Sequence, residues 1–169
     1  MKSLCLGVLL GSMALWLGCA PIAVKTDYDR TIDFTNYQTF KWMPYPKKRG
    51  KNVVQKGSFE DVRIRRAVES ELLAKGYQVK KSGRADALLA YHVAVRQQVS
   101  LDRYGYGYGY WGRHTHVRRY KEGTIIIDIV DPEMKQLIWR GAASGFGSRP
   151  DQEKINQAVA KIFEKYPPQ

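Results

Sequence analysis

Few residues of this sequence combine the type and the spacing that a known chemistry needs, and Cys19 is the first of them. It ends an apolar run and follows a small residue, in the order Leu17-Gly18-Cys19-Ala20. This pattern is typical of a lipobox, in which the thiol receives diacylglycerol and the chain is cut before the cysteine. Trp16 occupies the place where the usual lipobox has leucine, three residues before the cysteine. We expect Cys19 to be acylated.

The segment before Cys19 has the features of a signal peptide. Lys2 supplies a positive start, and the run from Leu4 to Leu17 carries no charge. A span of a membrane needs roughly 20 apolar residues, so this run is short for one. Removal of residues 1–18 would take Cys5 away and leave Cys19 as the only cysteine, and acylation would protect its thiol in an oxidising compartment. The alternatives are an uncleaved anchor helix and a conventional signal peptide with a stray cysteine.

The histidines are the next candidates for chemistry. His114 and His116 have the His-x-His spacing that can share a metal, and His92 lies in a predicted strand. The stretch around this pair contains no carboxylate or thiol that could complete a metal site. Its basic residues would repel a cation, and they are Arg113, Arg118, Arg119 and Lys121. We expect no metal site and no cofactor.

Catalytic motifs are missing from the sequence. It has no Gly-x-Ser-x-Gly elbow, no His-Glu-x-x-His and no phosphate-binding loop. The glycine-rich turn at Ser144–Ser148 is followed by Arg149-Pro150 rather than Lys-Ser/Thr. Asp128 and Asp131 stand at the end of a predicted strand, where a turn-capping role is expected. We expect that the protein is not an enzyme.

Aromatic and basic residues gather in two segments that suit a binding surface. The first has tyrosine at every second position and a basic tail: Tyr104, Tyr106, Tyr108, Tyr110, Trp111, Arg113, Arg118 and Arg119. The second, in the predicted loop 44–57, includes Lys47, Lys48 and Arg49. The Gly/Tyr stretch is either a platform for glycan, peptidoglycan or a membrane interface, or a long hairpin loop without a partner, and its glycines favour the loop.

The net charge of +12 favours anionic partners in general. Export makes nucleic acid an unsuitable partner, so the basic segments are expected to face anionic lipid headgroups or wall polymers. Solvated loops with no partner are the alternative.

The secondary structure that must hold these segments follows from periodicity. Alternation predicts strands at 39–42, 85–95, 123–130 and 136–141, with short strands at 22–25 and 77–79. Ser58 and Asp61 predict a capping box that opens a helix ending at Gly76, and a second helix starts near Asp151. The order predicts an α+β two-layer sandwich, with a mostly antiparallel sheet and two helices packed on one face. The N-terminal segment would partly cover the other face, or that face would be left wet.

Several pieces of the chain, in order, resemble the lipoprotein family catalogued as domain of unknown function 4136. They are Asp27-Tyr28-Asp29, residues 34–42 (FTNYQTFKW), 63–77 (RIRRAVESELLAKGY), 85–93 (ADALLAYHV), 122–131 (EGTIIIDIVD) and 137–141 (LIWRG). The resemblance covers nearly all of the chain after Cys19 and implies an envelope lipoprotein. It assigns no general activity and no catalytic residue.

Together these observations predict a signal peptide at 1–18, a lipidated tether at 19–26, and one α+β domain at 27–169 with a Gly/Tyr-rich loop at 101–118. We expect a membrane-anchored envelope lipoprotein that faces the periplasm and binds an envelope protein, peptidoglycan or anionic lipid without catalysis. Ala20, in place of the aspartate that retains lipoproteins at the inner membrane in enterobacteria, indicates the outer membrane. The alternative is a carrier of a small ligand or lipid, with a cavity between sheet and helices.

Overall fold

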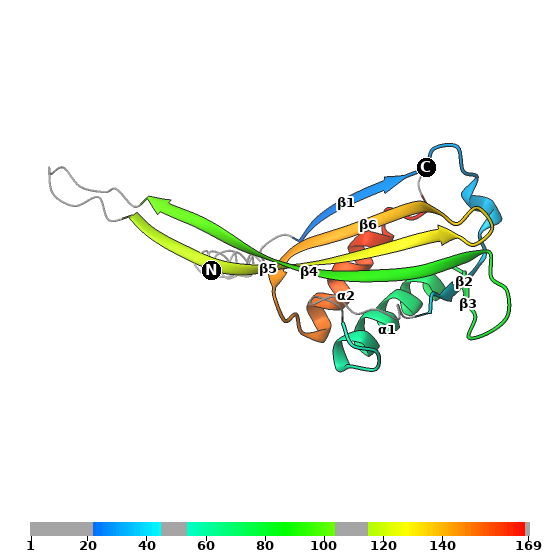
Figure 1. The fold of residues 1–169 in the computed structure, drawn as a ribbon, viewed down its shortest axis with the longest axis horizontal. Helices are drawn as coiled ribbons and strands as arrows, with labels where there is room; N and C mark the ends of the chain where they lie inside the picture. The colour runs from blue at the N-terminus through cyan, green and yellow to red at the C-terminus, as the bar shows by residue number, and fades with distance from the viewer. Residues whose placement is uncertain (1–21, 45–53, 104–114, 168–169) are drawn as a thin grey trace, which may run out of the picture.

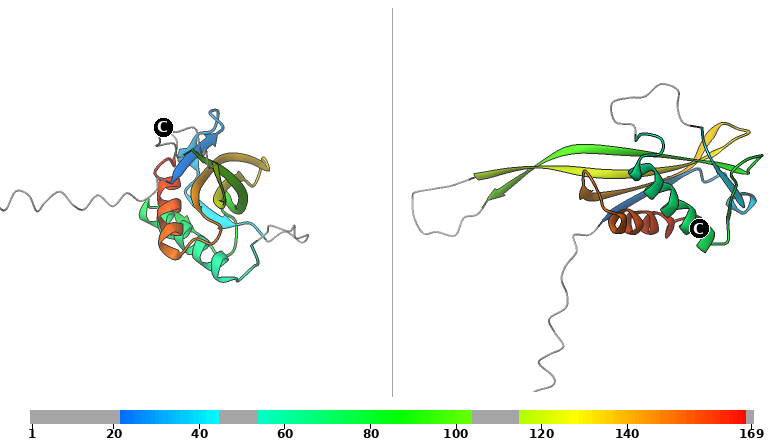
Figure 2. Two further views of the ribbon diagram at one scale, coloured as in Figure 1. Left: turned by 90° about the vertical axis from the view of Figure 1, so that its left-hand side faces the viewer. Right: turned by 90° about the horizontal axis from the view of Figure 1, so that it is seen from below.

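The computed structural model describes residues 22–44, 54–103 and 115–167 and arranges them as one sheet with two α-helices (Figure 1). The strands are β1 (Ala23–Tyr28), β2 (Thr39–Trp42), β3 (Gln78–Val79), β4 (Ala87–Arg103), β5 (Thr115–Asp131) and β6 (Gln136–Gly147). The helices are α1 (Phe59–Ala74), α2 (Gln152–Phe163) and a short 3-10 turn at Phe34–Asn36. The predicted α+β class is confirmed, and both helices lie on one face of the sheet (Figure 2).

The sheet is mixed, with the strand order β1-β6-β5-β4-β2-β3. β4, β5 and β6 form an antiparallel meander, and β1 adds to β6 antiparallel. β2 instead runs parallel to both β4 and β3. The sheet is therefore mostly antiparallel, as predicted, with one parallel corner. The parallel pair β2–β3 follows from α1, because a helix between two strands of a sheet acts as a crossover connection.

The described part of the N-terminal segment, from residue 22 on, does not lie over the open face of the sheet. Residues 23–28 form the edge strand β1 instead, with Ala23 opposite Ser144 and Tyr28 opposite Trp139. Val24 and Tyr28 are half-buried and pack on the core. Their spacing on alternate positions lets them cover the core from within the sheet, which explains the difference from the prediction.

Helix α1 begins and ends at the predicted signals. The Ser58 hydroxyl accepts a hydrogen bond from the Asp61 N–H at 3.2 Å, as an N-cap does. The Asp61 carboxylate accepts from the N–H of Gly57 at 2.8 Å. In a capping box this carboxylate would accept from the N–H of Ser58. The bond that Asp61 makes is therefore shifted by one residue, to the N–H of Gly57. Gly76, at φ 87°, follows the last turn in the left-handed conformation that glycine favours.

The core lies between the inner face of the sheet and the two helices. Side chains with no exposed surface come from both layers, among them Leu89, Ile127, Val68 and Ile162. Gly141 allows the closest approach, because a Cβ there would collide with Ile162 and with the Trp139 ring. Helix α2 and strand β6 therefore pack so closely at position 141 that only glycine fits there.

An aromatic cluster fills the end of the core next to the 3-10 turn. Trp139 stacks on Phe163 with ring centroids 5.9 Å apart, and Tyr166 meets the Trp139 ring edge-on at 5.1 Å. The Tyr166 hydroxyl and the Trp139 ring N–H are buried, and neither has a hydrogen-bond partner within the described residues. Burial raises the pKa of Tyr166 above its ordinary range.

Tyr37 is anchored differently from Tyr166. It donates a 2.7 Å hydrogen bond from its hydroxyl to Asp131, whose carboxylate also accepts from the backbone N–H groups of Glu133 and Met134. The predicted turn-capping role of Asp131 is confirmed by these two backbone bonds. Burial, followed by the bond to Asp131, raises the pKa of Tyr37 to about 12. The same bond is the main cause that lowers the pKa of Asp131.

β4 and β5 are longer than the strands beside them. β6 pairs with β5 no further than Glu122, and β2 pairs with β4 no further than Leu89. Residues 97–103 and 115–121 therefore form a two-stranded β4–β5 arm that projects from the sheet (Figure 1). At about 3.3 Å per residue, its seven pairs extend roughly 23 Å.

The β4–β5 arm also corrects the predicted loop at 101–118. Strand pairing continues to Arg103 and resumes at Thr115, so only residues between them connect the strands. The alternation of apolar and polar residues at Val99, Leu101 and Val117 continues the strand pattern beyond the predicted ends.

Candidate functional site

The described residues form a pocket where β2 ends beside β4. It has a volume of about 380 Å³ and a mainly apolar lining that includes Trp42, Met43, Leu89, Ala90, Tyr91 and Val130. Arg65 of α1 and the pair His92 and Asp128 supply its charged and polar groups. Pro44 follows β2, and among the described residues the pairing of β2 with β4 ends at Leu89, which leaves room for the pocket.

The helix-facing wall of the pocket is a stack of one guanidinium and two aromatic rings. The Arg65 guanidinium lies 4.4 Å from the centre of the Trp42 ring and 5.8 Å from that of Tyr91. The two rings meet edge-on, with centroids 6.0 Å apart. A cation held over an indole face is stabilised by the ring quadrupole, by about 0.5–2 kcal/mol. The stack therefore gives this wall a fixed shape.

Carboxylates from α1 hold the stack in place. Asp61, 2% exposed, accepts from the Tyr91 hydroxyl at 2.7 Å and from Arg65 Nε at 2.8 Å. The Trp42 ring N–H donates to Glu69 at 2.8 Å. Each of the three side chains in the stack thus donates a hydrogen bond to a carboxylate of α1. Hydrogen bonds to charged groups are the stronger kind.

A second charged group lies on the open face of the sheet. Asp128, 5% exposed, accepts from Arg140 with both oxygens, at 2.6 and 2.8 Å. His92 Nε2 lies 3.4 Å from Oδ2, the oxygen that accepts the longer of these two bonds. The bond to Asp128 raises the pKa of Arg140. The predicted capping role of Asp128 is wrong, because its side chain lies on the sheet face and pairs with the strand opposite.

The described lining of the pocket has groups that could contact a ligand. A histidine next to a carboxylate can serve in proton transfer, but this carboxylate is shared with a bidentate arginine. The described lining of the pocket has no serine, threonine or cysteine side chain that could attack a substrate. Among the residues that the structure describes, no three His, Cys, Asp or Glu side chains come together as a metal would need.

Most of the predicted site residues lie outside the described ranges. These are Cys19, Lys47, Lys48, Arg49, Tyr104, Tyr106, Tyr108, Tyr110, Trp111 and Arg113, and His114 joins them. Arg118 and Arg119 belong to β5, opposite Ser100 and Val99 in the β4–β5 arm. No helix within the described part of the chain is long and apolar enough to cross a membrane.

The pocket was not predicted from the sequence. Its members come from β2, α1 and β4, and only the i, i+4 spacing of Asp61 and Arg65 signals a pair in advance. Arg65 falls on the polar side of the helix pattern, where a solvated role is expected. The parallel placement of β2 beside β4 brings Trp42 and Tyr91 together, and no local sequence pattern predicts this contact.

Comparison with known proteins places the fold in a family. Residues 24–168 match the family described as Domain of unknown function (DUF4136). The chain belongs to this family. No curated protein is similar enough in sequence to match it.

Two solved structures are similar to this family member at low identity. A PDZ domain protein from Parabacteroides distasonis is 15% identical with a TM-score of 0.59 over 88% of the chain, which spans 36% of that protein's length. A PelC dodecamer from Paraburkholderia phytofirmans is 12% identical with a TM-score of 0.48, and 85% and 95% of the two chains are covered. At 15% identity, the likeness to the PDZ domain protein concerns the fold alone.

Proposed function

We propose that this family member is an envelope lipoprotein that is anchored through Cys19 and acts by binding a periplasmic or surface partner. The uncharged run before Cys19 and the lack of any later cysteine support the anchor. The β4–β5 arm is the observation that carries the binding role. A two-stranded ribbon is marginal by itself in water, so an arm that leaves the sheet suits contact with a partner.

The arm is basic in composition. Its two strands contain Arg103, Arg118, Arg119 and Lys121 against one acidic residue, Asp102. Basic residues near an anionic membrane surface contribute about 1 kcal/mol each. Anionic headgroups, phosphorylated glycans and wall polymers are therefore the favoured partners, and a negatively charged protein surface has the same chemistry.

The anchor is tested by metabolic labelling with a palmitate analogue. The wild type and Cys5→Ala should carry the label and sediment with membranes, because Cys5 lies in the segment that is removed. Cys19→Ala should lose both the label and the sedimentation. Label that persists in Cys19→Ala contradicts the anchor. Density separation of the inner and outer membranes then tests the outer-membrane destination. In an enterobacterial host, Ala20→Asp should move the protein from the outer to the inner membrane.

The binding role is tested by photo-crosslinking in cells. A photoreactive residue at Arg118 samples the arm, and one at Lys154, exposed on α2, is the matched control on the body. Partners should appear from position 118 and not from 154. Equal products from both positions, or none from 118, would count against the arm as the contact surface.

Binding of a small apolar ligand is a second candidate, and the pocket beside β2 favours it. The space between sheet and helices, where a carrier would be expected to have its cavity, is occupied by side chains with no exposed surface. Ala90→Phe should fill the pocket. A fatty-acid analogue that changes Trp42 fluorescence in the wild type should fail to do so in this variant, while Ala142→Phe serves as the control on β6.

A further inference from the structure

The chain enters the sheet at the end from which the β4–β5 arm projects. The strand registers place the first residue of β1 in one row across the sheet, formed by Ala23, Ser144, Thr124 and Ala94. β1 begins at this row and runs away from the arm, because it is antiparallel to β6, which runs toward the arm (Figure 1). This row is called the arm end of the domain below.

The proposed anchor has a short connection to the arm end. Cys19 precedes Ala23 by four residues, and four residues of extended chain span at most about 14 Å. The acyl chains of Cys19 would be in the membrane, so Ala23 would be no further than this from the membrane surface. The β4–β5 arm extends roughly 23 Å from the sheet. The arm is therefore longer than the connection that would have to keep it away from the membrane.

Sheet twist sets the direction in which the arm leaves the domain. Each strand is rotated by about 20–25° from its neighbour, and β4 is the third strand from β1. The arm therefore leaves the sheet at roughly 60–75° to β1. With β1 directed at the membrane, the arm lies nearly along the membrane surface, at a height that the short connection limits.

Exposed basic side chains lie around the arm end. They come from β1, β4, β5 and the segment before α2, and they are Lys25, Arg96, Lys121 and Arg149. The acidic residues described at this end are half-buried Glu122, and Asp151 and Glu153 at the start of α2. The Asp151 carboxylate caps that helix by accepting from the N–H of Lys154 at 2.8 Å. Basic side chains near a membrane surface are attracted to its anionic headgroups.

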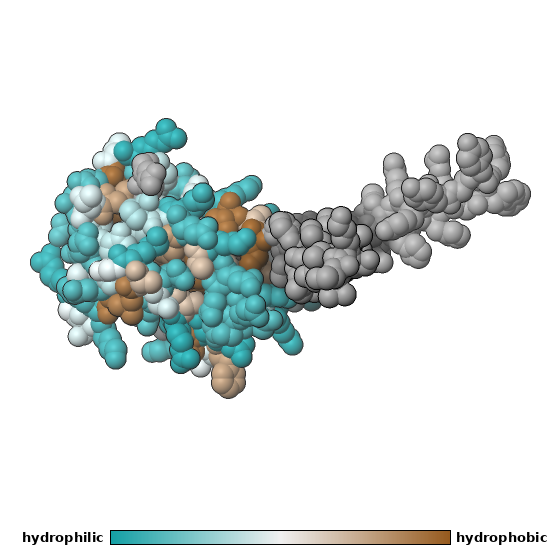
Figure 3. Space-filling view, turned by 180° about the vertical axis from the view of Figure 1, so that it is seen from behind, coloured by the Kyte–Doolittle hydropathy of each residue, from teal (hydrophilic) through white to brown (hydrophobic). Residues whose placement is uncertain are grey.

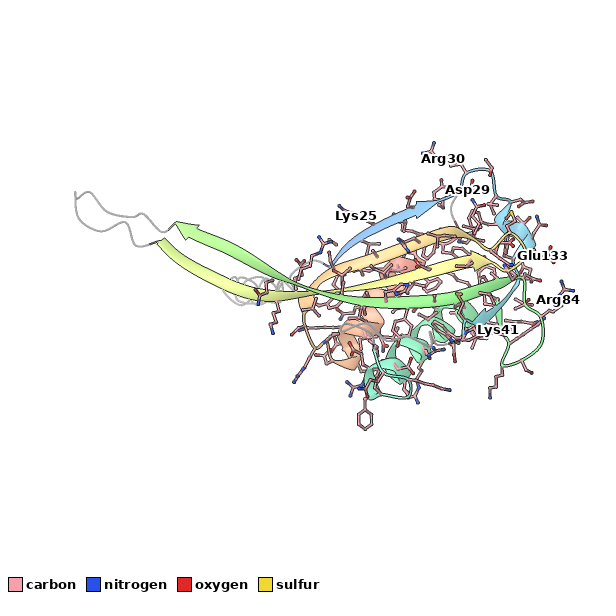
Figure 4. All side chains as sticks on the ribbon, in the orientation of Figure 1. Lys25, Asp29, Arg30, Lys41, Arg84 and Glu133 are labelled. Atoms are coloured by element: carbon pink, nitrogen blue, oxygen red, sulfur yellow. The ribbon has the colours of Figure 1, made fainter. Side chains whose placement is uncertain are left out.

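The opposite end of the domain carries exposed carboxylates among its basic groups. Figure 4 shows Asp29, Arg30, Arg84 and Glu133 at this end, and Lys25 on β1 toward the arm end. Asp29 accepts from the hydroxyl of Thr31 at 2.7 Å. Asp33 and Asp86 are bonded to threonine hydroxyls in the same way. These fixed negative charges make the opposite end the less suitable one to face an anionic membrane.

From this geometry we infer that the arm end of the domain rests on the bilayer that holds Cys19, with the β4–β5 arm along the lipid headgroups. The opposite end is then directed away from the membrane. The inference rests on the proposed anchor, and it selects lipid headgroups among the partners that suit a basic arm.

Fluorescence quenching on vesicles tests this orientation. The mature, lipidated chain is labelled at one introduced cysteine and placed in vesicles of phosphatidylethanolamine and phosphatidylglycerol, which also contain a lipid with a nitroxide on its headgroup. Gln97→Cys places the dye at an exposed position where the arm begins. Glu133→Cys, in the turn after β5, is the matched control. Lys121, the partner of Gln97, and Asp131 are ten residues apart along β5, or roughly 33 Å.

The nitroxide lipid should quench the dye at position 97 and not at position 133. Equal quenching at the two positions, or none at position 97, in a chain that floats with the vesicles would overturn the inference and leave the anchor intact. A chain that does not float refutes the anchor, and the orientation is refuted with it. Dye uptake by the wild type would likewise show an unacylated Cys19, so the two failures are distinguishable.

Two pairs of charge reversals test whether the basic residues hold the arm end on the membrane. In labelled Gln97→Cys, Lys25→Glu together with Arg149→Glu should reduce the quenching at least about twofold, because the new carboxylates repel phosphatidylglycerol. Arg30→Glu together with Arg84→Glu makes the same change of charge at the opposite end and should leave the quenching unchanged. Circular dichroism checks the fold of each variant. Equal effects of the two pairs, or no effect of either, would overturn the inference.

Discussion

Tyr37→Phe is expected to destabilise the fold by about 1.5–3 kcal/mol at neutral pH. The substitution removes one hydroxyl and little else, and Phe34 still contacts the ring at a centroid distance of 6.2 Å. The lost hydrogen bond is a strong one, since a neutral donor bonds to a carboxylate over 2.7 Å in a buried place. Such bonds contribute about 1.5–3 kcal/mol. Asp131 keeps its two backbone donors, so the loss should stay within that range.

The stability difference between wild type and Tyr37→Phe should become smaller at both low and high pH. The pKa of Asp131 is lowered on folding, so its contribution is present above the unfolded value near 3.9 and is lost as the pH falls through the folded value. The pKa of Tyr37 is raised to about 12, so its contribution is present below about 10 and is lost as the pH rises toward 12. The difference should be widest between about pH 5 and pH 9.

Urea unfolding followed by circular dichroism, at pH 3, 7 and 11, measures this difference directly. The midpoints of wild type and variant should be furthest apart at pH 7, with similar slopes in urea. A difference that is unchanged at pH 3 would refute the carboxylate as the acceptor that matters. A difference below about 0.5 kcal/mol at pH 7 would refute the strength assigned to the bond.

Three further substitutions, one of them with a control, test other parts of the packing. Tyr166→Phe should leave stability unchanged or raise it by about 1 kcal/mol in the same urea assay, because it removes a buried hydroxyl that has no partner within the described residues. Gly141→Ala should lower stability by about 1–3 kcal/mol, since its Cβ meets Ile162 and the Trp139 ring, whereas Gly147→Ala, with open space around it, should be neutral in thermal melts. Arg140→Lys should cost about 0.5–1.5 kcal/mol, because lysine cannot make both bonds that Asp128 accepts.

Local signals predicted most of the elements correctly. Ser58 and Gly76 stand where α1 begins and ends, and Asp151 stands where α2 begins. Each acts through a backbone group that lies within four residues. The β5–β6 hairpin follows equally from its turn. Signals of this range are readable because the residues that interact are close together in the chain.

The site depended on contacts that no local pattern reveals. The parallel placement of β2 brings Trp42 next to β4, and the alternation at 39–42 is the same for either direction of the strand. The partner of Asp128 is likewise Arg140 across a hairpin, so that an apparent turn residue belongs to the sheet face. A rear view shows the consequence on the surface, where apolar residues form small groups among hydrophilic ones (Figure 3). Their grouping depends on which strands are neighbours.

The position of β1 also determines when the sheet can be completed. β1 is first in the chain among the described strands, but its partner is β6, and the side-chain bond from Gln136 to Asp29 spans 107 residues. At about 5–20 residues per second, synthesis of that interval takes roughly 5–20 seconds. Throughout it, Val24 and Tyr28 have no strand to pair with. β1 therefore waits for β6, and the sheet closes only when its last strand has been made.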